Sequence, residues 1–351
     1  MLWMKLRLGE IGERGIISEL TPLFSKPEHV LLGIGDDAAV LKLGENMVVA
    51  TTDMIQSDTH IPPQMTPHQI GKLVVTVNYS DLAAMGAKPL GILVSMGLPP
   101  DMLEEDLISL AKGIEEMATR YGGCMLGGDT KNSPRLTLAG AALGVPYNKQ
   151  VFTRGGASPG DLVGVTGQLG LGAAGLETLL RGLDPKRFGS AVKAALEPEP
   201  RLLEAELLAS TGAVTAANDV SDGLAWELYE ISAASGVGIE IWEEKLPIPS
   251  VVSEVAGELD IDPLELALHR GWDYELLVTL KPGKTELVQQ LLEERGYKLS
   301  LIGHVTEGDV IIIHTKKDGG GEETGVLEPR GYEHLTSTSR ASRLGAWKNR
   351  D

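Results

Sequence analysis

The sequence predicts a protein of two α/β domains. Its 351 residues exceed the usual length of one compact domain. Apolar runs of strand length alternate with amphipathic helical segments in both halves. Proline and glycine gather in residues 146–160, where we expect the boundary. We therefore expect an N-terminal domain over 1–148, a C-terminal domain over 149–336 and a loose polar tail over 337–351.

In the N-terminal half, helices are predicted where apolar residues recur every three or four positions. Thr66 and Pro67 form an N-cap and first-turn pair at the start of one helix. Acidic residues fill the first turns of another, which Gly122 closes. The expected helices are 15–24, 67–80 and 101–121, and the expected strands lie within 30–41, 46–53, 90–98, 124–128 and 136–145.

The C-terminal half is also predicted to contain both strands and helices. Its glycine-rich turn 167–172, between a strand and a helix, is able to hold a phosphate. It matches neither the dinucleotide nor the P-loop pattern, and helix–strand packing explains its glycines equally well. Trp226 and Tyr229 are expected to face the core. The expected strands are 161–166, 213–219, 238–242, 272–280, 299–305 and 310–314, and the helices are 173–181, 198–210, 224–235 and 284–295.

Composition excludes several classes of function. The net charge of −18 argues against binding to nucleic acid or to anionic membranes, because both require a basic face. No apolar run approaches the ~18 residues of a membrane span, and the N-terminus does not resemble a signal peptide. The single Cys124 excludes an intramolecular disulfide and a cysteine-based metal cluster. We therefore expect a cytoplasmic protein.

Acidic residues beside glycine or hydroxyl residues form the most informative pattern. Taken singly, each is more often a turn former than a ligand. Together they suggest a magnesium site for phosphoryl transfer, since Mg²⁺ prefers hard oxygen ligands and the other coordination positions go to phosphates and water. Asp36 and Asp37 are neighbours in an extended chain, so only one is expected to point inward. The five acidic segments are 36–37, 51–53, 80–81, 127–130 and 219–223.

Residues 78–87 are the stretch on which these segments are expected to converge. They place Asp81 between an amphipathic helix that ends at Gly86 and a run of small residues. Elsewhere, Arg154 is a candidate phosphate partner, although an exposed salt bridge explains it on sequence alone. His60 is a candidate substrate contact, with a surface histidine as the alternative. No Ser-His-Asp or Cys-His arrangement stands out.

Seven ordered motifs resemble those of the thiamine-monophosphate kinases. That family is a branch of the ATP-binding superfamily that also contains aminoimidazole ribonucleotide synthetase, selenophosphate synthetase and a hydrogenase maturation protein. The resemblance runs from about residue 9 to 280, with a weaker echo at 331–334. The matching segments are 9–17, GIGDDAAVL (33–41), TTDM (51–54), VNYSDLAAMGAKPLG (77–91), GGDT (127–130), TRGGASPGDLVGVTG (153–167) and DVSDGL (219–224).

The resemblance implies an N-terminal α/β domain that forms a dimeric β-barrel with a second copy, followed by a C-terminal α/β domain. It implies that ATP and Mg²⁺ bind, and that the γ-phosphoryl group passes in line to thiamine monophosphate. No general base is required, because the acceptor phosphate is already ionised. By position, the implied metal ligands are Asp37, Thr51, Thr52, Asp53, Asp81, Asp129, Asp219 and Asp222. The implied ATP contacts are Gly128, Asp129, Arg154 and Ser221, and the substrate-side residues are His60, Trp272 and Tyr332.

The chain departs from the family pattern at one position. Trp272 stands where the family has a glutamate, in the segment 271–276. A tryptophan can stack on an aromatic ring but removes a charge partner for a cationic substrate. Two alternatives therefore stay open: a superfamily kinase or synthetase with another small-molecule acceptor, and a nucleotide-binding maturation protein.

Overall fold

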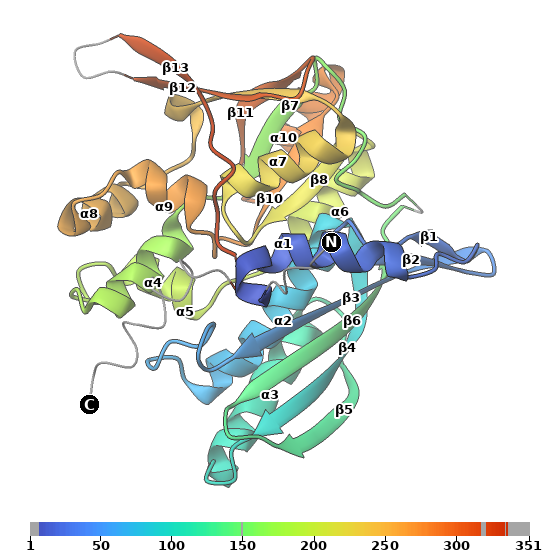
Figure 1. Ribbon diagram of the computed structural model, residues 1–351, viewed down its shortest axis with the longest axis vertical. Helices are drawn as coiled ribbons and strands as arrows, with labels where there is room; N and C mark the ends of the chain where they lie inside the picture. Colours follow the sequence, from blue (N-terminus) through green and yellow to red (C-terminus); the bar gives the residue numbers. More distant parts are fainter. Residues whose placement is uncertain (1–6, 149, 317–320, 334, 336–351) are drawn as a thin grey trace, which may run out of the picture.

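The computed structural model describes residues 7–148, 150–316, 321–333 and 335. Two sheets organise these residues, and helices lie beside both (Figure 1). The first sheet has six strands in the order β1-β2-β3-β6-β4-β5, and its ends do not meet within the described chain. These strands are β1 (Val30–Leu32), β2 (Ala39–Leu43), β3 (Asn46–Gln56), β4 (Ala87–Leu98), β5 (Met125–Asn132) and β6 (Thr137–Pro146).

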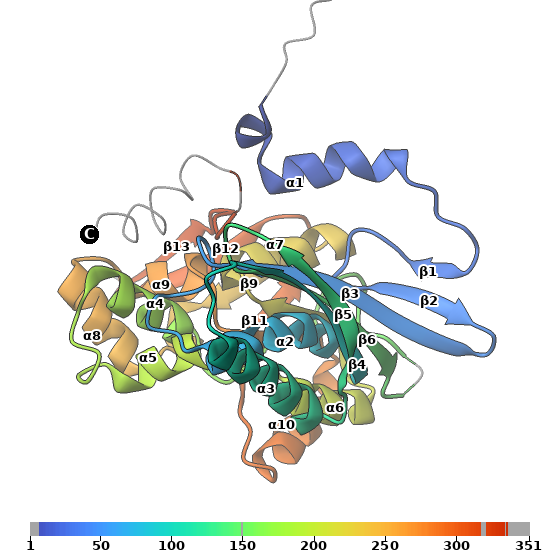
Figure 2. The same ribbon diagram turned by 90° about the horizontal axis from the view of Figure 1, so that it is seen from below.

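Helices α2 (Pro67–Ala84) and α3 (Glu104–Arg120) cover one face of this sheet (Figure 2). They approach closely, since a side chain on Gly71 would lie 2.0 Å from the Leu110 carbonyl oxygen. The other face carries large apolar side chains that are exposed. They are Met54, Leu90, Leu93 and Leu126.

The second sheet has seven strands in the order β13-β12-β9-β11-β7-β10-β8. Helix α7 (Leu224–Ser235) packs on one face, and α6 (Leu202–Thr211) and α10 (Thr285–Glu293) lie on the other. The strands are β7 (Leu162–Thr166), β8 (Val214–Val220), β9 (Gly238–Trp242), β10 (Glu275–Leu280), β11 (Leu299–Thr306), β12 (Ile311–Lys316) and β13 (Glu322–Val326).

Four helices form a small group at one end of the second sheet (Figure 1). Phe188 and Leu266 are among the buried residues that hold this group together. Only the first of them was predicted from the sequence, and the other three were missed. The helices are α4 (Leu171–Arg181), α5 (Gly189–Leu196), α8 (Ser250–Leu259) and α9 (Pro263–His269).

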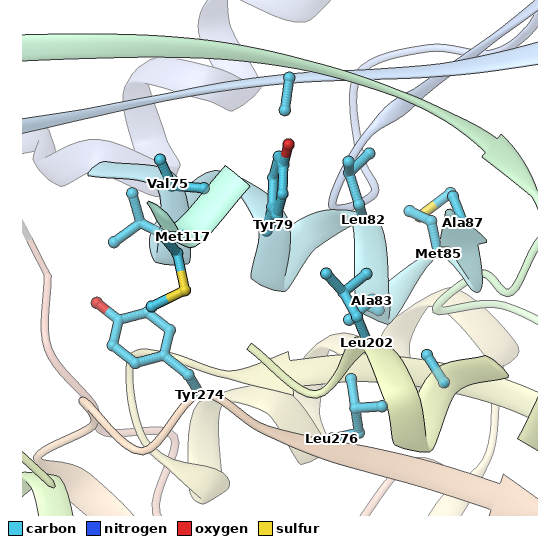
Figure 3. Close-up of a cluster of buried hydrophobic side chains, with 14 of the residues drawn as sticks. Val75, Tyr79, Leu82, Ala83, Met85, Ala87, Met117, Leu202, Tyr274 and Leu276 are labelled. Carbon is cyan, nitrogen blue, oxygen red and sulfur yellow. The ribbon is translucent and has the colours of Figure 1, made fainter. Parts of the chain in front are cut away.

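Helix α2 lies inside a hydrophobic core that both halves of the chain share. In Figure 3, Tyr79 and Leu82 point toward the first sheet, whereas Ala83 points toward Leu202 and Leu276 of the second half. Burial on both sides explains why α2 is apolar around most of its circumference. The two halves are therefore packed as one body around this helix.

Helix α1 (Leu8–Leu20) and residues 327–333 lie together outside the sheets. Figure 1 shows the red C-terminal segment running down to the start of α1. Gly12 interrupts α1 with φ 75°, and the short helix η1 (Thr21–Leu23) follows it. The helix was expected at 15–24, so it starts seven residues earlier than predicted. The predicted tail 337–351 lies outside the described residues.

Several element boundaries differ from those expected. Strand β5 continues past the expected end at 128 to Asn132, and β3 continues past Asp53 to Gln56. Both are stabilised by pairing along their whole length, which hydroxyl and acidic residues do not signal. Strand β10 begins at Glu275 rather than at 272, because Trp272 and Tyr274 have positive φ values of 79° and 52°. No helix of the described chain is long and apolar enough to cross a membrane.

Candidate active site

A cavity of about 410 Å³ lies between the two halves of the chain. Its size is typical of a small-molecule site. Eight carboxylates line it, whereas only two arginines do. The acidic lining residues are Glu13, Asp36, Asp37, Asp53, Asp81, Asp219, Asp222 and Glu227, and the basic ones are Arg14 and Arg154.

Three of these carboxylates form the acidic cluster, which we define as Asp37, Asp81 and Asp219. One oxygen of each lies within 4.8 Å of an oxygen of the other two. They come from the loop before β2, the last turn of α2 and the end of β8. Of the four segments expected to converge on Asp81, 36–37, 51–53 and 219–223 line the same cavity, whereas 127–130 does not.

The acidic cluster is crowded with negative charge. Burial raises the pKa of Asp81 well above its usual range, and the charges of Asp53, Asp219 and Asp37 raise it further. Burial also raises the pKa of Asp219 to about 7, with a further contribution from Asp37. Oxygen Oδ2 of Asp37 is buried and accepts no hydrogen bond from the described residues. Such a set of hard oxygen donors fits a divalent cation such as Mg²⁺.

Asp36 and Asp37 divide their roles as the sequence predicted. The side chain of Asp37 is only 2% exposed and pairs with Arg154, whose Nη2 lies 2.5 Å from Oδ1. Asp36 instead accepts hydrogen bonds from the backbone N–H groups of Asp37 and Arg154. Asp37 therefore faces the acidic cluster, while Asp36 shapes the loop.

Strand β3 contributes residues from both faces. The hydroxyl of Thr51 donates to Oδ2 of Asp81, so it lies beside the acidic cluster. The hydroxyl of Thr52 donates instead to the Gly140 carbonyl oxygen at 2.7 Å and is not part of that group. Asp53 lines the cavity, and its backbone N–H donates to the Asn78 side chain at 2.9 Å, which ties β3 to α2.

The turn after β8 is held by Glu227, a residue that the sequence interpretation missed. Its carboxylate accepts from Asn218 Nδ2 at 2.7 Å and from the Asp222 N–H at 3.2 Å. Ser221 donates to Asp219 at 3.4 Å, and both Ser221 and Asp222 line the cavity. Glu227 thus fixes the turn that presents these side chains.

Aromatic side chains line the other end of the cavity. The rings of His60 and Trp272 lie 6.4 Å apart between centroids, and Tyr274 meets Trp272 edge-on at 5.8 Å. The indole N–H of Trp272 donates to the Ala195 carbonyl oxygen at 3.0 Å, which fixes the ring. Tyr332 also lines the cavity, and its backbone N–H donates to the Asp222 carbonyl oxygen at 2.9 Å. The three predicted substrate-side residues therefore line one cavity.

Comparison with known proteins assigns the family. Residues 35–146 match the model of the AIR synthase related protein N-terminal domain, and residues 158–316 match that of the C-terminal domain. The thiamine-monophosphate kinase of Pyrococcus abyssi is 37% identical over 319 residues, which cover 90% of this chain and 95% of that protein. The Bacillus subtilis thiamine-monophosphate kinase is 34% identical over 93% of this chain and 100% of its own length. The chain belongs to the thiamine-monophosphate kinase family.

A solved structure of this family, AaThiL complexed with AMPPCP and TMP, has a TM-score of 0.81 and 28% identity to the chain. The match covers 94% of this chain and 99% of that one. The thiamine-monophosphate kinase from Stenotrophomonas maltophilia, at 32% identity and a TM-score of 0.72, covers 85% and 94%. The order of the two domains is therefore that of the family.

Two of the family-derived positions lie outside the cavity of the single chain. Asp129 pairs in register with Ser95, whereas Asp53 lies three strands away on β3. Neighbouring strands are ~4.8 Å apart, so the separation is about 14 Å. Side chains alternate between faces, which places Asp129 on the face opposite to Asp53. Gly128 and Asp129 line no part of the cavity.

The glycine-rich turn 167–172 contains no open phosphate site. The backbone N–H groups of Gly170 and Gly172 donate to the two oxygens of Asp273, at 2.6 and 3.0 Å. The N–H of Gln168 donates to Glu275 at 3.1 Å. Its donors are therefore satisfied within the protein, and the packing explanation of the turn holds.

Trp226 and Tyr229 lie on α7 and are half-buried. Arg14 stacks on Trp226, and the Tyr229 hydroxyl donates to the Leu327 carbonyl oxygen at 2.6 Å. Tyr229 packs against the hydrophobic core as expected, whereas Trp226 faces α1, so the expectation was wrong for Trp226 alone. Glu13, Arg14 and Ile17 of α1 also line the cavity. In the sequence, only the family motif 9–17 indicated that these residues have a role.

Proposed function

We propose that the protein phosphorylates thiamine monophosphate to thiamine diphosphate, using ATP and Mg²⁺. The observation that carries this proposal is the cavity that joins the acidic cluster at one end to an aromatic wall at the other. Family membership supports it, since AaThiL is described in complex with an ATP analogue and TMP. A kinase acting on a different acceptor is the alternative that Trp272 keeps open.

The acidic cluster, with Thr51, Asp53 and Asp222 around it, would hold the magnesium. Magnesium bound there supplies the positive charge that offsets the phosphate groups, as phosphoryl transfer requires. Arg154 is placed to contact the ATP phosphates, and Ser221 lies beside it on the cavity wall. The proposal includes Asp219 among the ligands, since its oxygens already accept from the hydroxyls of Ser80 and Ser221.

At the other end, the chain provides orientation rather than proton transfer. The fixed indole of Trp272 offers a flat apolar wall for the ring system of the acceptor. His60 and Tyr332 flank the same space. The acceptor phosphate is ionised at neutral pH, so no side chain has to remove a proton.

An ADP-release assay tests the proposal directly. It compares thiamine monophosphate, thiamine and no acceptor, each with ATP and Mg²⁺. We expect ADP release only in the reaction that contains thiamine monophosphate. Equal ADP release without an acceptor, or with thiamine in its place, would contradict the proposed acceptor.

We further propose that the protein is a cytoplasmic homodimer whose first sheets form a barrel together, with domains over 1–148 and 149–336. The exposed apolar face of the first sheet supports this, because an exposed patch of such residues is typical of an interface. Asp129 lies on that face, beside Ser95, and with the neighbouring Gly128 would reach the cavity of the second copy, which explains why both are remote from their own. The dimer would thereby assemble the metal and ATP contacts that the family resemblance assigns to them.

Mixing two inactive variants tests this arrangement. In a mixed dimer of Asp81→Asn and Asp129→Asn chains, one cavity receives an intact Asp81 and an intact Asp129 from different copies. We expect mixing after reversible dissociation to restore activity, up to half of the wild-type value per dimer. If both residues serve their own chain, the mixture stays inactive.

A further inference from the structure

Two arginines share one carboxylate at the rim of the cavity. Nε of Arg14 lies 2.9 Å from Oε1 of Glu230, and Nη1 of Arg154 lies 3.3 Å from Oε2 of the same residue. Because both guanidinium groups contact Glu230, they lie side by side. Both arginines line the cavity. Arg154 comes from the loop before β7, whereas Arg14 comes from α1, at the other end of the sequence.

The guanidinium group of Arg14 is fixed in orientation. It stacks on the Trp226 ring, with Cζ 3.7 Å from the ring centroid, and its Nε is paired with Glu230. Its two terminal nitrogens donate no hydrogen bond to residues 7–148, 150–316 or 321–333. A planar, held guanidinium with free terminal N–H groups is preorganised to bind an oxyanion by two parallel hydrogen bonds.

The cavity is strongly acidic, so a cation such as Arg14 that could contact a phosphate is significant. Of the ten charged side chains that line it, eight are acidic. Arg154 already pairs with Asp37 and Glu230. A bound phosphate would meet an excess of negative charge on the protein, so each available cation matters. Arg14 is the one lining cation in the described chain whose terminal nitrogens are not committed to a carboxylate.

A role limited to holding α1 in place explains only part of this geometry. The pairing of Nε and the stacking on Trp226 would suffice to anchor the helix. The kink at Gly12 and the bond from the Arg14 N–H to Glu333, at 3.4 Å, bring this turn of α1 over the cavity. Anchoring requires neither the cavity-lining position nor the open terminal nitrogens. Figure 2 shows α1 outside the two sheets, and the contacts of Arg14 with Trp226 and Glu230 hold it against α7.

We propose that Arg14 binds a phosphate group in this cavity, and that this contact holds α1 over the site. The inference extends the proposed function, from which it takes the two sources of phosphate: the nucleotide and the acceptor. The chemistry recognised is the same in both cases. Arg14 thereby links the N-terminal helix to the reaction.

The test compares Arg14→Met with Arg7→Met. Both changes remove one positive charge from the N-terminal end of α1, but Arg7 is exposed and lies outside the cavity. Calorimetry measures binding of a non-hydrolysable ATP analogue with Mg²⁺, and separately of thiamine monophosphate with Mg²⁺. We expect Arg14→Met to weaken one of these by about tenfold to a hundredfold, the range of charge-assisted hydrogen bonds. Arg7→Met should bind both like the wild type.

The ligand whose binding is weakened in Arg14→Met identifies which phosphate Arg14 contacts. Hydrogen exchange adds a readout that activity does not provide: the analogue or acceptor bound by Arg14 should protect residues 8–20 in the wild type but not in Arg14→Met. Arg14→Lys keeps the charge without the planar fork and should show an intermediate loss, so it serves if the methionine variant does not fold. Binding and exchange equal to those of Arg7→Met in both arms would overturn the proposal. An absence of thiamine-monophosphate turnover in the wild type would overturn only the proposed acceptor, since the nucleotide arm is measured without it.

Discussion

Two groups of buried carboxylates in this protein have opposite surroundings. In the paired cluster, which we define as Arg201, Asp273 and Glu275, each charge has partners from the protein itself. Glu275 accepts from Arg201 Nε and Nη2 at 2.7 and 2.8 Å and from the Thr166 hydroxyl at 2.7 Å. In the acidic cluster, three carboxylates face one another and Arg154 pairs with Asp37.

The difference separates structural acids from functional ones. The paired cluster satisfies its hydrogen-bonding needs when the chain folds, so it stabilises the junction of β7, β10 and α6. The acidic cluster keeps a surplus of negative charge that only added cations offset. Sequence motifs did not separate the two groups, because Asp219 and Glu275 both lie at strand ends that contain acidic residues.

The largest expected effect is on catalysis. Asp81→Asn removes a charge from the centre of the acidic cluster and should lower kcat by on the order of a hundredfold or more. Circular dichroism and thermal unfolding should show an intact fold. Asp101→Asn, an exposed control, should leave kcat unchanged. Near-normal turnover of Asp81→Asn would remove Asp81 from the site.

Substitutions in the paired cluster should lower the free energy of unfolding rather than kcat. Glu275→Ala leaves Arg201 buried without its main partner and should cost about 3–5 kcal/mol of unfolding free energy. Urea denaturation measures this, with Glu286→Ala on the exposed side of α10 as the control. The remaining folded protein should keep its affinity for the ATP analogue. Equal stability of the two variants would show that the Arg201 pair contributes little.

The acidic cluster should make the metal-free protein less stable as the pH rises. The pKa of Asp219 is about 7 in the folded protein against an ordinary 3.8, so between these values the folded state holds a proton that the unfolded chain has lost. Stability therefore falls from about pH 4 to pH 7, by at most about 4 kcal/mol for this group. Thermal unfolding without Mg²⁺ measures the decline.

Added Mg²⁺ should reverse this decline, because the metal binds the ionised carboxylates. The stabilisation by Mg²⁺ should thus grow from pH 6 to pH 8. Asp219→Asn should reduce the pH dependence, to which Asp53 and Asp273 also contribute because burial raises their pKa values to about 6 and about 7, and should reduce the response to Mg²⁺. A melting temperature that rises over this range in the absence of metal would contradict the assignment.

The smallest effect is expected at the glycine-rich turn. Asp273→Asn keeps the shape of the side chain but weakens the bonds from the Gly170 and Gly172 N–H groups, at a cost of about 1–2 kcal/mol. Affinity for the ATP analogue should not change, because the turn is filled by protein groups. The exposed control is Asp262→Asn. If Asp273→Asn lowers the affinity for the ATP analogue more than this control does, the turn contacts the phosphates after all.

The sequence by itself determined the class of fold, most of the elements and the family, because periodic apolar patterns and ordered motifs are local properties of the chain. It also singled out Asp81, which the structure places beside residues of three of the four other acidic segments. These inferences needed only helix geometry and the alternation of side chains along extended backbone.

The tertiary structure decided which acids face one another and which are paired. It separated Asp129 from Asp53 by three strands and placed the two on opposite faces, a consequence of the strand order β3-β6-β4-β5 that no local pattern contains. It also brought Arg14 beside Arg154, although the two lie 140 positions apart in the chain. Such contacts depend on long-range packing, and therefore they emerge only when the whole chain is folded.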